Sequence, residues 1–292
     1  MKICQKCHSS FDSSDWLCPA CGFSPGTANG FVIFDPEGNN SDAGFNPDLF
    51  EDLFELEAGN FWFRVRNRII AWSLEKYFPA KKEFLEIGCG TGFVLANLEK
   101  EIAGMTFSGS ELHAAGLTFA KRRLERSLLW QMDACKIPFK DHFDVIGAFD
   151  VLEHIKDDQK VLEQIFQALR PGGGVILTVP QHPVLWSMAD EHAHHERRYK
   201  GRELQNKVKS AGFEILRTTS FVSFLLPLMM VSRFTKKSSR EDYDPLGELK
   251  INRILNAVLE RILGFESMLI RMGVSFPFGG SLLLVAQKPE SS

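Results

Sequence analysis

The sequence predicts a doubly wound α/β fold, in which helices cover both faces of a seven-stranded, mostly parallel sheet. Short apolar runs alternate with helical segments from about residue 84 onward. A glycine-rich turn stands between the first of these runs and the helix that follows it. The chain has 292 residues and is 44% hydrophobic, which is enough apolar material for one large domain with a smaller appendage.

Two helical patterns precede the sheet, at residues 49–56 and 60–70. The expected strands, in chain order, are residues 84–87, 106–110, 128–132, 143–149, 174–179, 213–220 and 281–287. The helices expected between them are residues 93–98, 114–126, 159–169 and 201–211. In a sheet built this way a ligand binds beyond the carboxyl ends of the strands, where the strand order reverses.

The turn after the first expected strand follows the pattern E-x-G-x-G-x-G, with Gly88, Gly90 and Gly92 after Glu86. Glycine lets the backbone approach a nucleotide-like ligand at the N-terminus of the next helix. A dinucleotide-binding turn, GxGxxG, would need a third glycine where Phe93 stands. The alternative is an ordinary turn between a strand and a helix.

Two acids follow the next two strands, in positions suited to a nucleoside. Glu111 ends the second expected strand, where a carboxylate can accept both ribose hydroxyls. The simpler explanation is an acid stabilised by the dipole of the helix that begins there. Asp133 follows the third strand and, taken alone, is a loop acid.

Three blocks together resemble the class I S-adenosylmethionine-dependent methyltransferases, and especially the O-methyltransferases of quinone biosynthesis. They are the glycine motif, residues 149–155 (Phe-Asp-Val-Leu-Glu-His-Ile) and residues 169–174 (Leu-Arg-Pro-Gly-Gly-Gly). The resemblance spans about residues 60–220. It implies S-adenosylmethionine as methyl donor and a small acceptor methylated at oxygen, which the long apolar insertion described below makes an apolar or lipid-linked molecule.

The resemblance also implies roles for individual residues. Arg68 would meet the methionine carboxylate, Asp133 the adenine amino group, and Phe149 would pack on the cofactor. The whole implied cofactor set is Arg68, Glu86, Gly88, Cys89, Gly90, Gly92, Glu111, Leu112, Asp133, Ala134 and Phe149. For Arg68 the alternative is a solvated helix residue.

His154, at the carboxyl end of the fourth strand, is the candidate base, because an oxygen acceptor must lose a proton. The alternative is that Glu153 and His154 only cap a turn. The quinone-type relatives carry E-x-x-E-H here and can use a divalent cation. Asp150 is one methylene shorter than the first of those glutamates, which leaves metal use open.

A second group of histidines and arginines follows the fifth strand. The residues expected to contact the acceptor are His182, His194, His195, Arg198 and Tyr199. Their density suits an anionic or phosphorylated acceptor, or a second base. Local ion pairs at the start of a helix explain them equally well.

Four cysteines in the first 21 residues follow the pattern CxxC, ten residues, CxxC: Cys4, Cys7, Cys18 and Cys21. Two such pairs can present four thiolates to one tetrahedral Zn²⁺, and the metal would supply folding energy to a segment with almost no core. Two disulfides are the alternative, which the absence of a secretion signal disfavours.

The cysteine pattern and the change of composition after it divide the chain. We expect a zinc ribbon at residues 1–24, a linker at 25–46 and the catalytic domain at 47–292. The linker is rich in Gly, Asn, Ser and Pro, and holds one short apolar stretch, residues 31–34, as a strand or docking patch.

The charge pattern disfavours nucleic acid as a partner. The net charge is −3, and no Lys or Arg stands between Lys6 and Arg64, a stretch rich in Asp and Glu that would repel phosphate. Two alternatives stay open: an RNA methyltransferase guided by the ribbon, and a regulator that binds S-adenosylmethionine without turnover. Because the acidic stretch disfavours nucleic acid, the expected role of the ribbon is a structural cap or a docking module for a protein partner.

Residues 221–280, between the last two strands, are far longer than a normal connection. An apolar run, residues 221–231, precedes Arg233, Lys236, Lys237 and Arg240, and residues 251–263 have the spacing of an amphipathic helix. We expect a helical lid over an apolar pocket, able to rest on a membrane surface. An extra core layer or a dimer interface is the alternative. With neither signal peptide nor apolar span, a cytoplasmic protein is expected.

Overall fold

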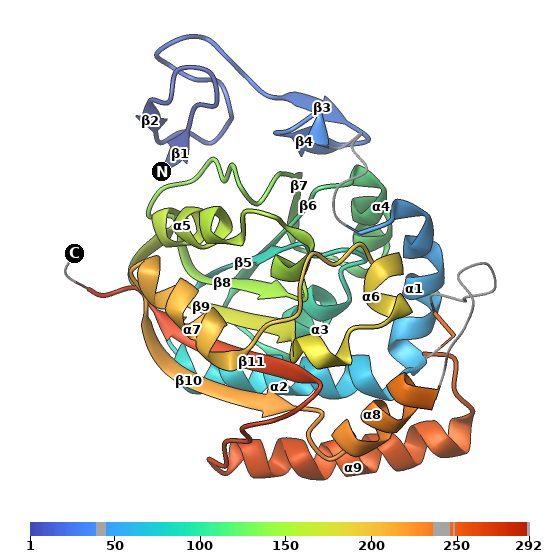
Figure 1. The fold of residues 1–292 in the computed structure, drawn as a ribbon. Coiled ribbons are helices and arrows are strands. Elements are labelled where there is room, and N and C mark those ends of the chain that lie inside the picture. The colour runs from blue at the N-terminus through green and yellow to red at the C-terminus, as the bar shows by residue number, and fades with distance from the viewer. Residues whose placement is uncertain (39–44, 236–245, 248, 291–292) are drawn as a thin grey trace.

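The computed structural model describes residues 1–38, 45–235, 246–247 and 249–290. A central sheet in the order β10-β11-β9-β8-β5-β6-β7-β4-β3 runs through the large domain (Figure 1). The seven expected strands are present: β5 (Glu83–Ile87), β6 (Thr106–Glu111), β7 (Leu128–Gln131), β8 (Phe143–Phe149), β9 (Leu169–Pro180), β10 (Glu214–Phe221) and β11 (Ser281–Gln287). The doubly wound, mostly parallel fold is therefore confirmed.

The sheet has nine strands within the described residues, so the expected count of seven is wrong. The two additional strands, β3 (Gly26–Ala28) and β4 (Phe31–Ile33), lie in the segment expected to be a linker. β4 pairs in parallel with β7, and Gln131 holds the chain just after β4, because its side chain bonds Asp35 N and Asp35 O. Residues 31–34 were expected as a strand or a docking patch, so β4 agrees with the first of these alternatives. β3 and the pairing with β7 were not predicted, because the partner is supplied by the open edge of β7.

Parallel pairing joins β9, β8, β5, β6 and β7, whereas β11 is antiparallel to both β9 and β10. The chain builds β5, β6 and β7 outward, then returns to place β8 on the other side of β5. The strand order therefore reverses between β5 and β8, which is where such sheets bind ligands.

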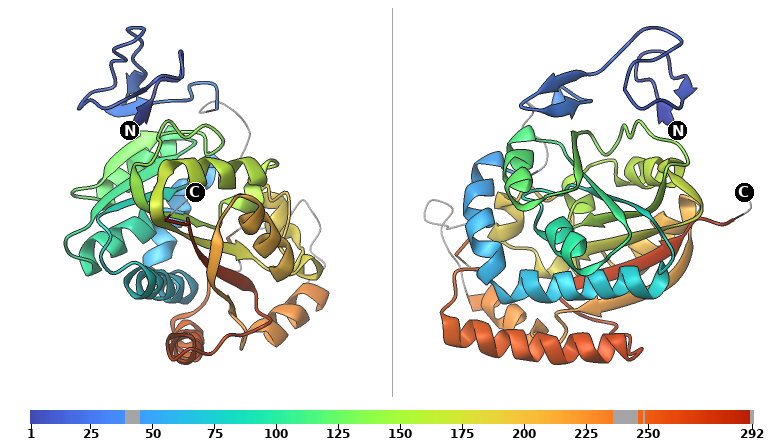
Figure 2. Two further views of the ribbon diagram at one scale, coloured as in Figure 1. Left: turned by 90° about the vertical axis from the view of Figure 1, so that its left-hand side faces the viewer. Right: turned by 180° about the vertical axis from the view of Figure 1, so that it is seen from behind.

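Helices cover both faces of the sheet (Figures 1 and 2). α2 (Phe61–Tyr77) and α3 (Phe93–Glu101) cover one face, and α5 (Asp158–Ala168) and α7 (Gly201–Ser210) the other. Successive residues of β5 serve the two cores, because Phe84 packs with α2 and α3 while Leu85 packs with α5. α4 (Ala114–Arg123) follows β6, and α1 (Phe50–Leu56) lies against α4.

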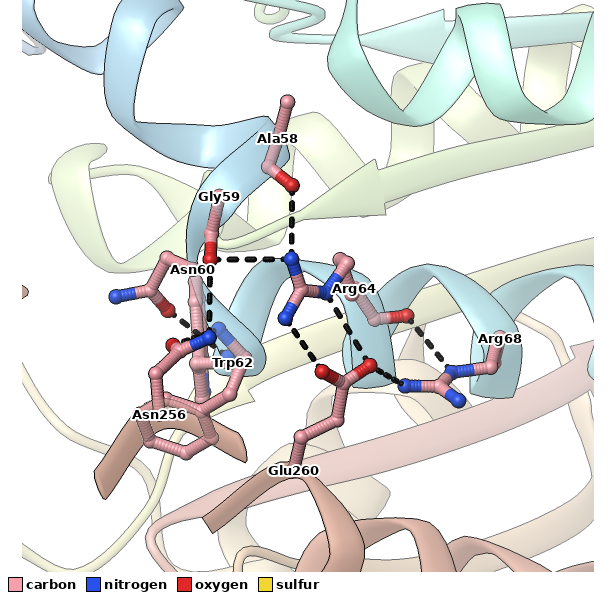
Figure 3. Close-up of polar contacts among 9 residues, drawn as sticks. Ala58, Gly59, Asn60, Trp62, Arg64, Arg68, Asn256 and Glu260 are labelled. Carbon is pink, nitrogen blue, oxygen red and sulfur yellow. Dashed lines mark hydrogen bonds and ion pairs between the residues drawn. The ribbon is translucent and has the colours of Figure 1, made fainter. Parts of the chain in front are cut away.

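The long connection between β10 and β11 is helical, as expected. α8 (Leu226–Thr235) lies near the sheet's carboxyl edge, and α9 (Arg253–Arg271) runs along the outside of α2 (Figure 1). Glu260 of α9 pairs with both Arg64 and Arg68 of α2 (Figure 3). Lys236, Lys237 and Arg240 lie outside the described residues.

The N-terminal cysteine segment forms a separate small unit against one edge of the large domain. Its two short strands, β1 (Lys2–Ile3) and β2 (Ser10–Phe11), pair with each other. Trp16 joins this unit to the large domain, with its ring centroid 4.4 Å from Phe34 and 5.4 Å from Phe139.

None of the helices within the described ranges is both long enough and apolar enough to cross a membrane.

Candidate functional site

A cavity of about 920 Å³ opens at the carboxyl ends of β5, β6, β7 and β8. Its floor is the turn after β5, and its walls come from the strand ends, α1, α2 and the loops after β8 and β9. The cavity lies at the reversal of strand order, so the fold alone brings these distant segments together.

The glycine turn is shaped for close approach, because Gly88, Gly90 and Gly92 all have positive φ. A Cβ at Gly88 would lie 2.5 Å from Val151, and one at Gly92 would lie 3.0 Å from Ala120. A Cβ at Gly90 would meet only Phe50, at 3.7 Å, so the space above Gly90 is open to a ligand. Gly92, expected to contact the cofactor, instead lets α3 approach α4.

A buried triad that the sequence did not reveal braces the turn. The Thr91 hydroxyl donates to Glu57, and Arg123 of α4 binds both side chains. Burial raises the pKa of Glu57, and the Arg123 charge opposes that rise. Glu57 lies in the short helical turn between α1 and α2 (Glu57–Gly59), and both Glu57 and Thr91 line the cavity. The triad therefore ties this segment to the glycine turn.

Glu111 is fixed in the wall by backbone donors. Its carboxylate accepts from Gly90 N at 3.0 Å, Leu112 N at 2.9 Å and His113 N at 3.3 Å. Burial raises the pKa of this carboxyl, while the same three bonds favour its ionised form. Glu111 and Leu112 both line the cavity, as the sequence predicted.

Asp133 and Ala134 also line the cavity, at the end of β7. Asp133 Oδ1 accepts from Cys135 N at 2.8 Å, which orients the carboxylate. The neighbouring wall includes Asp35 and Gly38, from the segment after β4. Their participation was not predicted, because it depends on the unexpected pairing of β4 with β7.

The remaining expected residues of the turn, Glu86 and Cys89, lie in the wall with Phe149 of β8. Burial raises the pKa of Glu86 well above its usual value. Its Oε2 atom is buried and has no hydrogen-bond partner among the described residues. A positively charged or donating ligand group would satisfy it.

Arg66, rather than Arg68, reaches the cavity. Arg66 lines it, forms an ion pair with Asp150 and lies over the Trp62 ring, 4.5 Å from its centroid. Arg68 points to the other side of α2, where it pairs with Glu260 (Figure 3). The expectation for Arg68 is corrected: residues two apart lie on nearly opposite sides of a helix, and α9 covers the side of Arg68.

The loop after β8 carries a buried carboxyl. Glu153 is fully buried, and neither of its carboxylate oxygens has a partner within the described ranges. Burial raises the pKa of Glu153 well above its usual value, and the nearby Asp150 adds to that rise. Asp150 itself is engaged by Arg66 and by the Thr178 hydroxyl.

His154 lies beside a second histidine. The His154 and His195 rings meet edge to face, with their centroids 4.6 Å apart, and both line the cavity. Burial lowers the pKa of His154 to about 3, and the nearby His195 contributes. His154 is therefore neutral at pH 7.

Asp190 orients His195. Burial opposes ionisation of Asp190, but its hydrogen bonds with His195 and Arg198 lower its pKa to about 2. An ionised carboxylate only accepts, so His195 Nδ1 donates to Asp190 Oδ1 at 2.9 Å. This arrangement leaves His195 Nε2 as the acceptor and stabilises positive charge on the ring.

Glu153, His154 and His195 each offer one ligand atom, all within 4.8 Å of one another, so these three side chains could hold a metal ion. Asp150, which the resemblance aligns with the first glutamate of E-x-x-E-H, forms an ion pair with Arg66 and does not belong to this group.

Two residues expected to contact the acceptor do not reach the cavity. The buried Tyr199 hydroxyl donates to Asp158 at 2.6 Å and belongs to the core beside α5. His182 packs against Phe278, with the ring centroids 5.8 Å apart. His194 and Arg198 do line the cavity, together with His195. Side chains with hydroxyl or imidazole groups are also found in protein cores, and the pattern of residues in the sequence cannot exclude such a position.

The four N-terminal cysteines converge on one point away from this cavity. Their sulfur atoms all lie within 4.8 Å of one another, with Cys4 to Cys21 at 3.6 Å and Cys7 to Cys18 at 3.7 Å. A tetrahedron of sulfurs about 2.3 Å from Zn²⁺ has edges of about 3.8 Å, so the spacing fits this metal. The cysteines are not disulfide-bonded.

Comparison with known proteins adds to this geometry. Residues 55–218, more than half of the chain, match the methyltransferase domain family. A probable S-adenosylmethionine-dependent methyltransferase of Mycolicibacterium smegmatis is 26% identical over 166 residues, which cover 55% of this chain and 62% of that protein. A ubiquinone biosynthesis O-methyltransferase of Escherichia coli is 30% identical over 122 residues, which cover 39% of this chain and 50% of that protein.

A solved complex between the Haloferax volcanii Trm112 methyltransferase activator and a methyltransferase shares the fold, with a TM-score of 0.57. That match has 18% identity and covers 84% of this chain and 98% of the other. The chain spans less than two thirds of the length of the two curated relatives above.

The placement of the two arginines predicts different effects of matched substitutions. Arg66→Gln should weaken S-adenosylmethionine binding by roughly tenfold to a hundredfold, because a charged hydrogen bond contributes about 1.5–3 kcal/mol. Arg68→Gln should leave the affinity unchanged, since Arg64 still pairs with Glu260. Titration calorimetry measures both; a loss confined to Arg68→Gln would contradict the assignment.

Proposed function

The chain belongs to the methyltransferase domain family, and we propose that it transfers the methyl group of S-adenosylmethionine to an oxygen of a small, apolar or lipid-linked acceptor. The observation that carries this proposal is that one cavity contains two chemically different parts. One part holds the glycine turn and two fixed acids, and another part holds a pair of histidines. Donor and acceptor would therefore meet inside one water-poor space.

The proposed cofactor position follows from the fixed groups in the wall. Glu111 receives the ribose hydroxyls, and Asp133 with Ala134 receives the adenine. The methionine end lies toward Arg66 and Glu86: the Arg66 guanidinium suits its carboxylate, and the unpartnered Glu86 Oε2 suits its amino group. The sulfonium supplies the activated methyl group, so the protein has mainly to align the acceptor and exclude water.

The rest of the cavity supports an apolar acceptor. Its wall there is built by apolar side chains from α1, α2, α8 and the segment before α9: Phe45, Leu49, Phe50, Leu53, Trp62, Met229, Leu246 and Leu249. Such a lining favours a largely hydrophobic molecule oriented by a few polar groups. α8 and the segment before α9 would act as its lid.

We propose that the histidine pair accepts the acceptor's proton. His154, the base expected from the sequence, is neutral at pH 7 but a weak acceptor, because burial lowers its pKa to about 3. His195 is supported by the Asp190 carboxylate, which stabilises the imidazolium. The proton therefore ends on His195, while His154 fixes the position of the His195 ring.

We further propose that the four N-terminal cysteines hold a structural Zn²⁺. Their spacing fits the ion, and the segment buries few apolar side chains of its own. The ribbon would then be a docking module for a protein partner rather than a guide for RNA, in keeping with its acidic surroundings.

Calorimetry with S-adenosylmethionine tests the cofactor site directly. Gly90→Val should abolish binding, because its side chain would fill the space above the turn. Gly104→Val is the matched control: Gly104 also has positive φ and open space, but it lies away from the cavity. Equal binding by both variants would refute the site.

Turnover is measured as release of S-adenosylhomocysteine with phenols that carry or lack an isoprenyl tail. The tailed phenols should react faster, because the apolar wall binds the tail. Cofactor binding without release, with every such acceptor, would favour the non-catalytic regulator. A parallel assay with chelator shows whether a cation at Glu153 and the two histidines takes part.

Removing the proposed proton acceptor should reduce turnover rather than cofactor affinity. His195→Ala and Asp190→Asn should each lower kcat by about 10²-fold or more, the usual contribution of a positioned base. His192→Ala, a change in the same segment outside the cavity, should have no such effect. An unchanged kcat in His195→Ala would indicate that His154, and not His195, accepts the proton.

Metal analysis of the purified protein should find one zinc per chain. Cys4→Ser with Cys18→Ser should lose the metal and make the first 24 residues sensitive to protease, because thiolate ligation supplies their folding energy. Cys135→Ser, distant from the cluster, should keep the metal. Protease resistance retained in the metal-free variant would show that the ribbon folds without zinc.

A further inference from the structure

We propose that the outward face of α9 is a docking surface for a bilayer of anionic phospholipid. Figures 1 and 2 show α9 as the outermost helix of its side of the molecule, with only one flank against α2. This inference deepens the proposed function, on which it rests only for the lipid-linked nature of the acceptor.

A continuous stripe of large side chains faces outward along α9. Its members follow one another at intervals of four and three residues: Ile254, Val258, Arg261, Phe265, Met268 and Met272. Ile254 is 80% exposed and Met272 73% exposed. Five of the six are apolar, which is the pattern of a helix that lies in the plane of a membrane surface.

The acidic side chains of α9 face the protein, whereas its arginines are exposed to solvent. Both carboxylates turn inward: Glu260 pairs with Arg64 and Arg68, and Glu266 is buried and accepts from Phe224 N at 2.8 Å. The arginines Arg253, Arg261 and Arg271 are exposed. The outward side of the helix is therefore apolar and positive, which complements anionic headgroups.

A smaller cavity of about 470 Å³ lies where the C-terminal half of α9 meets α2. Arg68 and Arg271 line it, together with Trp72, Met268 and Met272. Arg68 is already paired with Glu260, so it is the Arg271 guanidinium, beside an indole and two thioethers, that suits a headgroup phosphate and the start of its acyl chains.

The apolar face continues from α9 toward the large cavity. The Phe265 ring stacks on Phe224, 6.1 Å away between centroids, and both are exposed. α8 follows, with Leu228 exposed on its outside and Met229 lining the large cavity. A lipid-linked acceptor would thus pass from a bilayer under α9 to the cavity along α8.

The same charges argue against a second copy of the chain as the occupant. A symmetrical pairing of two α9 faces would bring six arginines together, and neither helix has an outward carboxylate to offset them. An anionic bilayer would neutralise the charge of each of the three exposed arginines of one chain.

The test is flotation of the whole protein with vesicles. Vesicles of phosphatidylglycerol and phosphatidylcholine should carry the protein upward at low salt, and vesicles of phosphatidylcholine alone should not. Ile254→Ser with Phe265→Ser and Met272→Ser should weaken the association by about tenfold or more, as should Arg261→Glu. Leu128→Ser, at an exposed leucine at the start of β7 and away from α9, should not.

These changes lie on the surface, so unaltered S-adenosylmethionine binding by each variant shows that the fold and cofactor site are intact. Absence of flotation with anionic vesicles at low salt would overturn the proposal and leave the proposed methyl transfer standing. Equal flotation by the variant changed at Ile254, Phe265 and Met272 would also overturn the proposal. A dimer in solution that this variant converts to monomer would overturn it too, because it would identify a second copy of the chain as the occupant.

Discussion

The parallel pairing of β7, β6, β5 and β8 is the constraint on which the site depends. Parallel strands end at one edge, so a glycine turn, two acids and a histidine loop that are far apart in the chain share one cavity. The pairing also demands a glycine at position 88, because Val151 of the loop after β8 occupies the space of its side chain. The Arg66–Asp150 ion pair then joins that loop to α2 across the wall.

Periodicity was enough to predict the seven main strands, and the glycine turn indicated the edge of the sheet at which the cavity opens. The pattern predicted those strands because each buries an apolar run, and it placed Glu111, Asp133 and His154 correctly at strand ends. β3 was missed, and β4 was expected only as a strand or a docking patch, because three-residue strands carry almost no alternation of their own. These strands form because β4 pairs with the edge of β7, and a tertiary contact of this kind cannot be seen in the local sequence.

The errors within the site have a common physical origin. α2 is covered on one side by the sheet and on another by α9, so its apolar pattern does not distinguish the side of Arg66 from the side of Arg68. Tyr199 was misplaced because a phenol can enter the core when its hydroxyl donates a hydrogen bond to a buried acid such as Asp158. Asp190, which orients His195, gave no signal, since an acid in a helix is usually solvated.

The pairing of β4 with β7 also bears on aggregation, because it covers an edge of the sheet. An uncovered β7 would present a row of free backbone donors and acceptors, a template for pairing with another chain. β4 covers that row, and the new outermost strand, β3, is only three residues long and begins with glycine. The N-terminal segment thus closes the edge at β7 and leaves a three-residue strand as the exposed border, which offers few backbone groups for pairing with another chain.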